Sequence, residues 1–339
     1  MEEIILVTGG AGYIGSPTCR LLKENGYMPV TFDNLSTGHQ YAVKWGPFEE
    51  GDLTDINRLR DVFEKYRFAG VVHFAANALV GESTEKPSLY YWNNVIGSLN
   101  LLQVMQEYGV NNIVFSSSCA TYGVPSSIPI TESTPRKPIN PYGRTKLMIE
   151  MALEDYSKAY GLRYAALRYF NAAGADIEAE LGENHQPETH LIPNVIEAAL
   201  HRRENISIFG TDFPTVDGTA VRDYIHVLDL ARAHLLALQW LGSHKQEVSH
   251  LIVNLGTGKP YSVKEIIEAT EEITQEKIVR DFRNKRPGDP PTLVADNALV
   301  RKLLGWEPIH SDLKNIIETA WQWHRMYLPE HRGLEEVFI

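Results

Sequence analysis

The sequence has few cysteines and no long apolar run, and both shortages restrict where and how the protein works. Cys19 and Cys119 are the only cysteines among 339 residues. Two such residues without metal-ligand spacing do not make a disulfide framework or a cysteine zinc site. No apolar run approaches the roughly 20 residues of a membrane helix, and no signal-peptide pattern precedes the strand-like run at 3–8. We therefore expect a cytoplasmic protein without a membrane partner.

Basic residues are also in short supply. Lys and Arg number 32 against 43 Asp and Glu, so the formal net charge is -11. Nucleic-acid binding depends on clustered cations that neutralise phosphates, so we expect no nucleic-acid partner. A small phosphate-bearing ligand remains possible, because a helix N-terminus and one or two arginines can hold it locally.

Strand-like and helical patterns alternate through the first half of the chain. Alternation at this spacing indicates βαβ units, and hence a Rossmann-type, doubly wound parallel α/β sheet with ligands at the carboxyl ends of its strands. After residue 171 the sequence becomes rich in loop-forming residues, which predicts a smaller α+β domain. We place the domains at 1–172 and 173–339, although the chain can cross back to the sheet. The predicted strands are 4–7, 29–32, 70–74, 112–115 and 163–168, and the predicted helices are 13–25, 55–66, 89–108, 141–160, 193–203, 228–241, 262–274 and 312–327.

A glycine-rich loop follows the first strand and opens the first helix. Gly9, Gly12 and Gly15 have the spacing G-x-x-G-x-x-G, which allows a tight turn and close approach of the backbone to a pyrophosphate. Asp33 closes the second predicted strand, where a carboxylate binds the ribose hydroxyls of NAD and repels the extra phosphate of NADP. Together these residues predict NAD binding by the first domain. Asp52 is either an adenine contact or a helix cap.

Tyr142 and Lys146 form the pair that predicts catalysis. Residues i and i+4 share one face of a helix, so the lysine cation can stabilise the tyrosine phenolate. Tyrosine titrates near pH ~10, so a base that works near neutral pH needs a pKa roughly 3 lower, or about 4 kcal/mol. Ser118, at the end of a strand, can bind the sugar oxygen or relay its proton. Alone, each feature is common on protein surfaces and in turns.

Several motifs resemble the extended short-chain dehydrogenases and, within them, the UDP-glucose/UDP-galactose 4-epimerases. The first group comprises 9–15 (GGAGYIG), 116–123 (SSSCATYG), 140–146 (NPYGRTK) and 167–171 (LRYFN). The epimerase-like group comprises 73–76 (HFAA), 80–83 (VGES), 209–215 (FGTDFPT), 217–219 (DGT), 221–227 (VRDYIHV) and 286–289 (RPGD). The likeness covers nearly the whole chain. It implies a Rossmann fold, bound NAD and reversible epimerisation of UDP-glucose and UDP-galactose through a 4-keto sugar.

The resemblance also assigns roles to individual residues. The catalytic residues would be Ser118, Tyr142 and Lys146. The cofactor would contact Gly9, Gly12, Tyr13, Ile14, Gly15, Asp33, Asn34, Asp52, Leu53, Phe74, Ala75, Ala76, Asn93, Tyr142, Lys146, Tyr169 and Phe170. The UDP-sugar would contact Ser118, Asn171, His190, Leu191, Ser207, Phe209, Arg222, Arg286, Asp289 and Leu293. Arginines suit a pyrophosphate, while Arg222 paired with Asp223 on the surface and Phe209 in the core are the structural alternatives.

Three departures from the family pattern affect the substrate and cofactor contacts. Ala78 stands where many members have a lysine near the cofactor, and His190 where an asparagine is frequent. Leu293 replaces a residue that is often a bulky aromatic in members restricted to unacetylated sugars. A leucine there would leave room for an N-acetyl group.

Other functions remain as alternatives. A nucleotide-sugar 4,6-dehydratase needs an acid and a base after the strand-end residue, but Cys119 and Ala120 follow Ser118. A 4-epimerase of UDP-xylose/UDP-arabinose or of UDP-N-acetylhexosamine fits the same motifs, and a non-catalytic NAD sensor is the alternative outside enzymes. The family resemblance further implies a homodimer through the helices at 89–108 and 142–160.

One segment suggests a metal site. Glu183, His185, Glu188 and His190 lie within eight residues, but their spacing matches no helix-borne metal motif and Pro187 interrupts the run. We therefore expect no metal and interpret the segment as a loop that covers the substrate.

Overall fold

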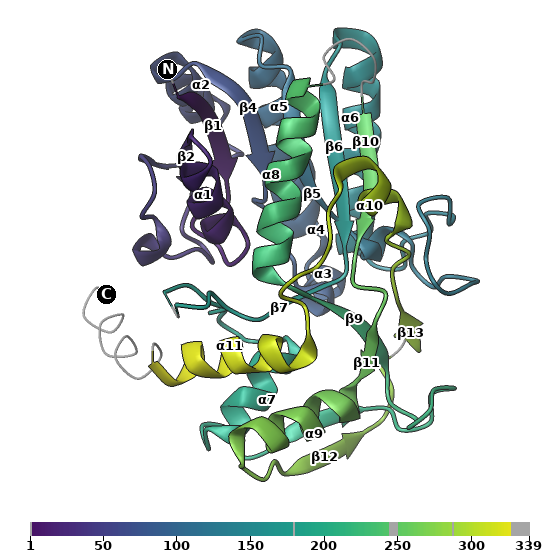
Figure 1. Cartoon of the computed structure of the whole chain (residues 1–339). Helices are drawn as coiled ribbons and strands as arrows, with labels where there is room; N and C mark the ends of the chain where they lie inside the picture. Colours follow the sequence, from purple (N-terminus) through teal and green to yellow (C-terminus); the bar gives the residue numbers. More distant parts are fainter. Residues whose placement is uncertain (1, 179, 244–249, 287, 327–339) are drawn as a thin grey trace.

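The computed structural model describes residues 2–178, 180–243, 250–286 and 288–326, and within them a seven-stranded parallel sheet dominates the fold (Figure 1). The strand order is β10-β6-β5-β4-β1-β2-β3. The strands are β1 (Glu3–Thr8), β2 (Tyr27–Asp33), β3 (Phe48–Glu50), β4 (Phe68–His73), β5 (Asn112–Ser118), β6 (Arg163–Tyr169) and β10 (His250–Leu255). This order confirms the predicted Rossmann-type doubly wound sheet.

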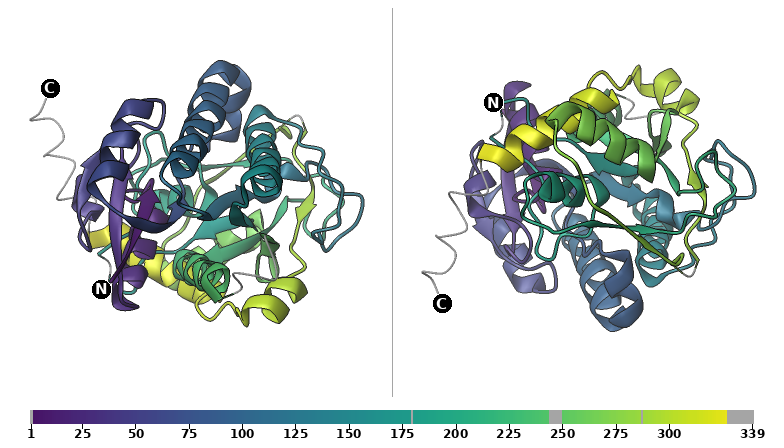
Figure 2. Two further views of the ribbon diagram at one scale, coloured as in Figure 1. Left: turned by 90° about the horizontal axis from the view of Figure 1, so that it is seen from above. Right: turned by 90° about the horizontal axis from the view of Figure 1, so that it is seen from below.

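Helices cover both faces of the sheet, as the two views along it show (Figure 2). Alternate residues of β1 serve the two cores, because Leu6 packs on one face while Ile5 and Val7 pack on the other. Strands buried on both faces have largely apolar sequences, which explains why the sequence pattern located five of the seven strands. It did not predict β3 or β10. One face carries α2 (Ile56–Lys65), α5 (Gly97–Glu107) and α6 (Pro141–Tyr160), and the other carries α1 (Gly15–Glu24), α8 (Val227–Ser243) and α10 (Ala298–Leu304).

The predicted single helix over 89–108 is wrong in detail. The structure has α3 (Val80–Glu85), α4 (Pro87–Tyr90), a π-helical segment η2 (Tyr91–Ile96) and then α5. The side chain of Asn94 within η2 is buried and bonds the backbone of Asn77 and the hydroxyl of Thr145 on α6. Apolar periodicity does not report such a π turn, which accommodates contacts to neighbouring elements.

A smaller α+β body lies beyond the carboxyl ends of the sheet strands (Figure 1). Its sheet segments are short and carry charged residues, as Arg222 and Asp223 in β9 illustrate, so the sequence pattern did not predict them. The body contains β7 (Asn171–Ala173), β8 (Ile206–Phe209), β9 (Val221–His226), β11 (Pro260–Ser262), β12 (Arg280–Arg283) and β13 (Thr292–Leu293), with α7 (Leu191–Ala199), α9 (Val263–Thr274) and α11 (Leu313–Met326). Two short 3-10 turns are η1 (Gln40–Ala42) and η3 (Cys119–Thr121).

The chain crosses back between the two bodies. From the second half of the sequence, α8 packs on β5 and β6, and β10 forms the edge of the large sheet beside β6. The described residues after 172 therefore build the smaller body and also complete the larger one, so no single cut at residue 172 separates the two bodies in space.

Candidate active site

The glycine-rich loop lies where its spacing predicted, between β1 and α1. Gly9 has a φ of 72°, and a Cβ there would lie 2.7 Å from the backbone nitrogen of Ala75. A Cβ on Gly15 would lie 2.1 Å from the carbonyl oxygen of Gly9, so no larger residue fits either position. A Cβ on Gly12 would meet only the Gly9 oxygen, at 3.3 Å. The loop thus leaves an open backbone cradle at the start of α1, suited to a pyrophosphate.

Asp33 closes β2 with its carboxylate turned toward this cradle. Its Oδ2 accepts from the backbone N–H of Ala11 and its Oδ1 from that of Leu35. Burial raises the pKa of Asp33, and these two bonds oppose the rise. Each oxygen keeps a lone pair for another donor. The Asp33 carboxylate therefore fits as an acceptor for the ribose hydroxyls of NAD.

Asp52 proves not to be the cap of α2. That role belongs to Asp55, whose side chain accepts from two backbone N–H groups. Asp52 instead accepts from the backbone and hydroxyl of Thr54 and from the amide of Asn34. Asn34 and Asp52 are thus held together beside the end of β2, with buried Leu53 adjoining them.

The end of β4 supplies the next predicted cofactor contacts. The backbone N–H groups of Phe74 and Ala75 both donate to the carbonyl of Thr8, which aligns residues 74–76 with the glycine-rich loop. Phe170, another predicted cofactor contact, is buried. The hydroxyl of Tyr169 hydrogen-bonds that of Ser116 at 2.6 Å, and the Asn93 side chain donates to the Asn94 side chain within η2. Tyr13 donates to the carbonyl of Gly174, and Ile14 precedes α1 directly.

The three proposed catalytic side chains meet between β5 and α6. Tyr142 and Lys146 lie in the first turns of α6, which Asn140 caps through the N–H of Gly143. The Lys146 nitrogen lies 5.8 Å from the centre of the Tyr142 ring and donates to the carbonyl of Ser116. Burial raises the pKa of Tyr142, and a hydrogen bond with Ser118 opposes the rise. Ser118 also caps η3 through the N–H of Ala120, so the structural role considered for it is real.

A buried ion pair beneath Lys146 was missed in the sequence. Glu150, one turn after Lys146, accepts from Ser117 at 2.6 Å and from the guanidinium of Arg168 at 2.8 and 2.5 Å. Burial lowers the pKa of Lys146 to about 7, and the Glu150 charge opposes this decrease. A signal existed, because an arginine inside an apolar strand pattern is expensive to bury unless an acid pairs with it.

Two predicted substrate-binding arginines lie in the smaller body. Arg222 on β9 donates to Asp289 at 2.5 Å, not to Asp223. Asp223 is fully buried and accepts backbone N–H groups from three residues, which excludes the surface ion pair considered as the structural alternative. The Arg286 guanidinium lies 3.9 Å over the Phe209 ring, which is half-buried and not in the core.

The other predicted substrate residues are spread over four elements. Asn171 opens β7, Leu191 opens α7 directly after His190, and Ser207 lies on β8. Leu293 on β13 pairs with Arg222 and packs against the apolar cluster that includes Phe170. The smaller body therefore holds two groups of predicted substrate residues. Leu293, Arg222 and Asp289 form one group, and Phe209 and Arg286 form the other.

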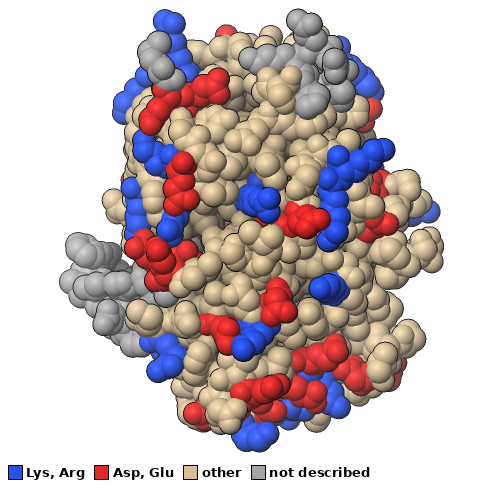
Figure 3. Space-filling model, in the orientation of Figure 1, with Lys and Arg blue, Asp and Glu red and all other residues tan. Residues whose placement is uncertain are grey.

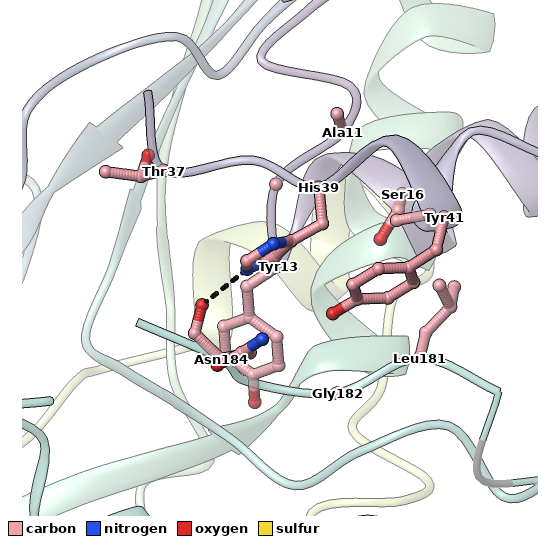
Figure 4. A pocket seen from close by; sticks show the side chains of 11 residues that line it. Ala11, Tyr13, Ser16, Thr37, His39, Tyr41, Leu181, Gly182 and Asn184 are labelled. Atoms are coloured by element: carbon pink, nitrogen blue, oxygen red, sulfur yellow. Dashed lines mark hydrogen bonds between the residues drawn. The ribbon is translucent and has the colours of Figure 1, made fainter. Parts of the chain in front are cut away.

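A small pocket lies beside the glycine-rich loop (Figure 4). Its walls come from the loop itself, from residues 37–42 and from residues 181–184, and the ring nitrogen of His39 lies 3.0 Å from the Asn184 carbonyl oxygen. None of the three proposed catalytic side chains lines it. We therefore assign no sugar to this pocket. It shows that the segment before α7 packs against the cofactor loop.

Acidic and basic side chains are interspersed over the face of the molecule in Figure 3. Among the helices that the structure describes, none has the length and apolar character required to cross a membrane.

Comparisons with known proteins agree with this geometry. A model of the NAD dependent epimerase/dehydratase family matches residues 5–256. A UDP-glucose 4-epimerase from Rhizobium leguminosarum bv. trifolii is 53% identical over 322 residues, covering 95% of this chain and 97% of the relative. The crystal structure of UDP-glucose 4-epimerase from Brucella ovis in complex with NAD is similar with a TM-score of 0.91 and 54% identity, covering 94% of this chain and 98% of that one. A UDP-glucose-4-epimerase structure from Stenotrophomonas maltophila, with bound NAD and formylated UDP-arabinopyranose, has a TM-score of 0.92 and 38% identity, covering 98% of this chain and 100% of that one. The chain belongs to the NAD-dependent epimerase/dehydratase family.

Proposed function

We propose that the protein interconverts UDP-glucose and UDP-galactose by reversible epimerisation at C4, with NAD retained through the cycle. The observation that carries this proposal is the convergence of Tyr142, Lys146 and Ser118 at the end of β5, on the sheet edge that also bears the glycine-rich loop. When bound, NAD accepts the C4 hydride and returns it to the opposite face of the sugar.

Residues of the chain itself remove the proton from the sugar and orient the substrate. Tyr142 takes the proton of the sugar 4-hydroxyl, and Ser118 lies in the hydrogen-bond path between them. Lys146 supplies positive charge that favours the phenolate of Tyr142. The 4-keto sugar then turns about its pyrophosphate linkage, so binding energy must reside on the uridine and phosphates rather than on the sugar.

Arginine contacts suit that distribution of binding energy. We assign Arg222 and Arg286 to the pyrophosphate and Phe209 to the uracil, because a guanidinium binds phosphate oxygens as a fork. Support comes from the Arg222–Asp289 ion pair and from the stacking of Arg286 on Phe209, which hold both guanidinium groups in place. Asn171, His190, Leu191, Ser207, Asp289 and Leu293 complete the proposed substrate set, and the cofactor residues named from the sequence complete the NAD site.

We also propose that two copies of the chain form a homodimer through α4–α5 and α6. The observation in favour is the apolar side chains that both helical segments expose. Leu89 and Trp92 are 44% and 63% exposed on one segment, and Met148 and Met151 are 45% and 54% exposed on α6. Pairing these surfaces would remove them from water. A cytoplasmic setting is proposed because both cysteines are free thiols.

The first experiment incubates purified protein with UDP-galactose and no added cofactor, followed by chromatography of the sugar nucleotides. UDP-glucose should appear, because NAD is retained. Tyr142→Phe is the matched control, since it removes one hydroxyl and leaves the ring. Absence of conversion even with NAD added would overturn the UDP-hexose assignment and redirect the test to UDP-pentoses, UDP-N-acetylhexosamines and then a non-catalytic NAD sensor.

A further inference from the structure

The loop between β7 and α7 brings four candidate metal ligands together. The donor atoms of Glu183, His185, Glu188 and His190 all lie within 4.8 Å of one another, the one such group of His, Cys, Asp and Glu among the described residues. The Nδ1 atom of His190 lies 2.8 Å from Glu183 and 2.9 Å from Glu188, and that of His185 lies 3.3 and 3.7 Å from the same carboxylates. Pro187 was expected to interrupt this group of residues, but the loop brings their donor atoms together.

The spacing of these donors suits a tetrahedral ion. Zinc binds imidazole nitrogen and carboxylate oxygen at about 2.0–2.2 Å, so neighbouring ligands of a tetrahedral site stand roughly 3.3–3.6 Å apart. The four His–Glu separations run from 2.8 to 3.7 Å and all donor atoms lie within 4.8 Å of one another, so rotations of the side chains would bring the donors to this spacing. Two nitrogens and two oxygens also favour zinc over magnesium or calcium, which take mainly oxygen ligands.

Two features make the cluster a suitable place for a cation. The Nδ1 atom of His185 is enclosed and makes no aligned hydrogen bond, although Glu183 lies nearby. The Glu188 carboxylate is fixed by the backbone N–H groups of Thr189 and His190, both at 2.7 Å. Glu183 is 5% exposed at its side chain, so two negative charges meet in a largely buried place that demands positive charge.

We propose that Glu183, His185, Glu188 and His190 bind one divalent transition-metal ion, best matched by Zn²⁺. Four protein ligands leave no open position, so the ion is structural rather than catalytic. It fixes residues 183–190 against the cofactor loop and α11: the His185 and Tyr13 rings pack in a T-shaped arrangement with their centres 6.3 Å apart, and Trp323 on α11 donates to the Glu183 carbonyl. His190 retains its second ring nitrogen for the substrate contact proposed above.

The test uses the full chain with its bound NAD. Metal is removed with a chelator, Zn²⁺ or Co²⁺ is added back, and the bound metal is counted by mass spectrometry after desalting. We expect about one ion per chain and a cobalt absorption spectrum of the four-coordinate type. His185→Asn and Glu188→Gln should each weaken binding by at least about 100-fold, since even partners of the ligands contribute 10–100-fold.

His201→Asn is the matched control, because His201 is an exposed histidine paired with Glu276 outside the cluster. Its metal content should equal that of the unmodified chain. If a cluster variant fails to fold, the cobalt spectrum and the ¹⁵N shifts of labelled histidines in the unmodified chain show whether the cluster binds the metal. The proposed metal site would be wrong if the unmodified chain bound no stoichiometric metal, or if binding survived in both His185→Asn and Glu188→Gln. The cluster would then be a network of protonated histidines and carboxylates.

Discussion

Replacing Glu150 by glutamine should weaken both the fold and the catalytic pair. The carboxylate is buried and accepts from Ser117, Arg136 and Arg168, and Arg168 itself is only 2% exposed. A glutamine turns an N–H group toward donors and leaves the guanidinium buried without its counter-charge. Removing one partner of a buried pair costs about 3–5 kcal/mol, so we expect that loss in the free energy of unfolding, measured by denaturant titration of tryptophan fluorescence.

Glu154→Gln is the matched control, one turn further along α6. Glu154 pairs with Lys158 at the exposed surface, and such pairs contribute at most about 0.5 kcal/mol. Glu150→Leu combined with Arg168→Met removes both charges and should recover most of the lost stability, since apolar replacement of a buried pair is often neutral. The Tyr122 hydroxyl would keep its bond to Asn254 in that variant.

The same change should alter the pH profile of activity. Burial lowers the pKa of Lys146 to about 7 and Glu150 opposes this, so losing the Glu150 charge lowers the pKa further. The cation is the useful form, and it is lost as pH rises through its pKa. The alkaline limb of the profile should therefore move to lower pH in Glu150→Gln and also in the double variant. If Glu150→Gln matches Glu154→Gln in stability and its profile does not move, the reasoning is refuted.

The remaining predictions concern the cofactor, the proton, the sugar and the assembly. Tyr142→Phe should reduce turnover about 10²–10⁴-fold while the purified protein keeps its NAD, as chromatography and cofactor content will show; unchanged turnover would remove Tyr142 from the mechanism. Asp33→Asn loses a charged acceptor for the ribose, so we expect roughly 10–100-fold weaker NAD retention, and undiminished cofactor content would contradict this. Leu293→Tyr should reduce conversion of UDP-N-acetylgalactosamine at least about tenfold relative to UDP-galactose; equal loss on both would speak against a pocket-volume role. Trp92→Glu should convert a dimer into a monomer in light scattering, because it buries a charge in the proposed interface.

Five of the seven strands of the large sheet were predicted from the sequence, whereas β3 and β10 were not. Residues 4–7 of β1 form a continuous apolar run because this strand is buried on both faces, and α6 was found at its observed ends. The glycine spacing and Asp33 could likewise be interpreted locally, because tight turns and strand ends constrain single residues. The smaller body was harder, since β13 is only two residues long and the partners of β9 come from distant segments.

The protonation of the catalytic pair depends on burial and on residues distant in the sequence, which the i,i+4 spacing does not report. The i,i+4 spacing places Lys146 near Tyr142, but burial raises the tyrosine pKa and lowers the lysine pKa to about 7, so both charged forms are disfavoured together. Glu150, held by Arg168 from β6, restores part of the lysine charge, and the Ser118 hydrogen bond restores part of the phenolate. These two contributions do not remove the desolvation cost. A further positive charge beside Tyr142 is therefore required for base catalysis near neutral pH, and the oxidised nicotinamide is the group of this family that carries one. On this argument, NAD retention and proton removal are coupled, and weakening either should weaken the other.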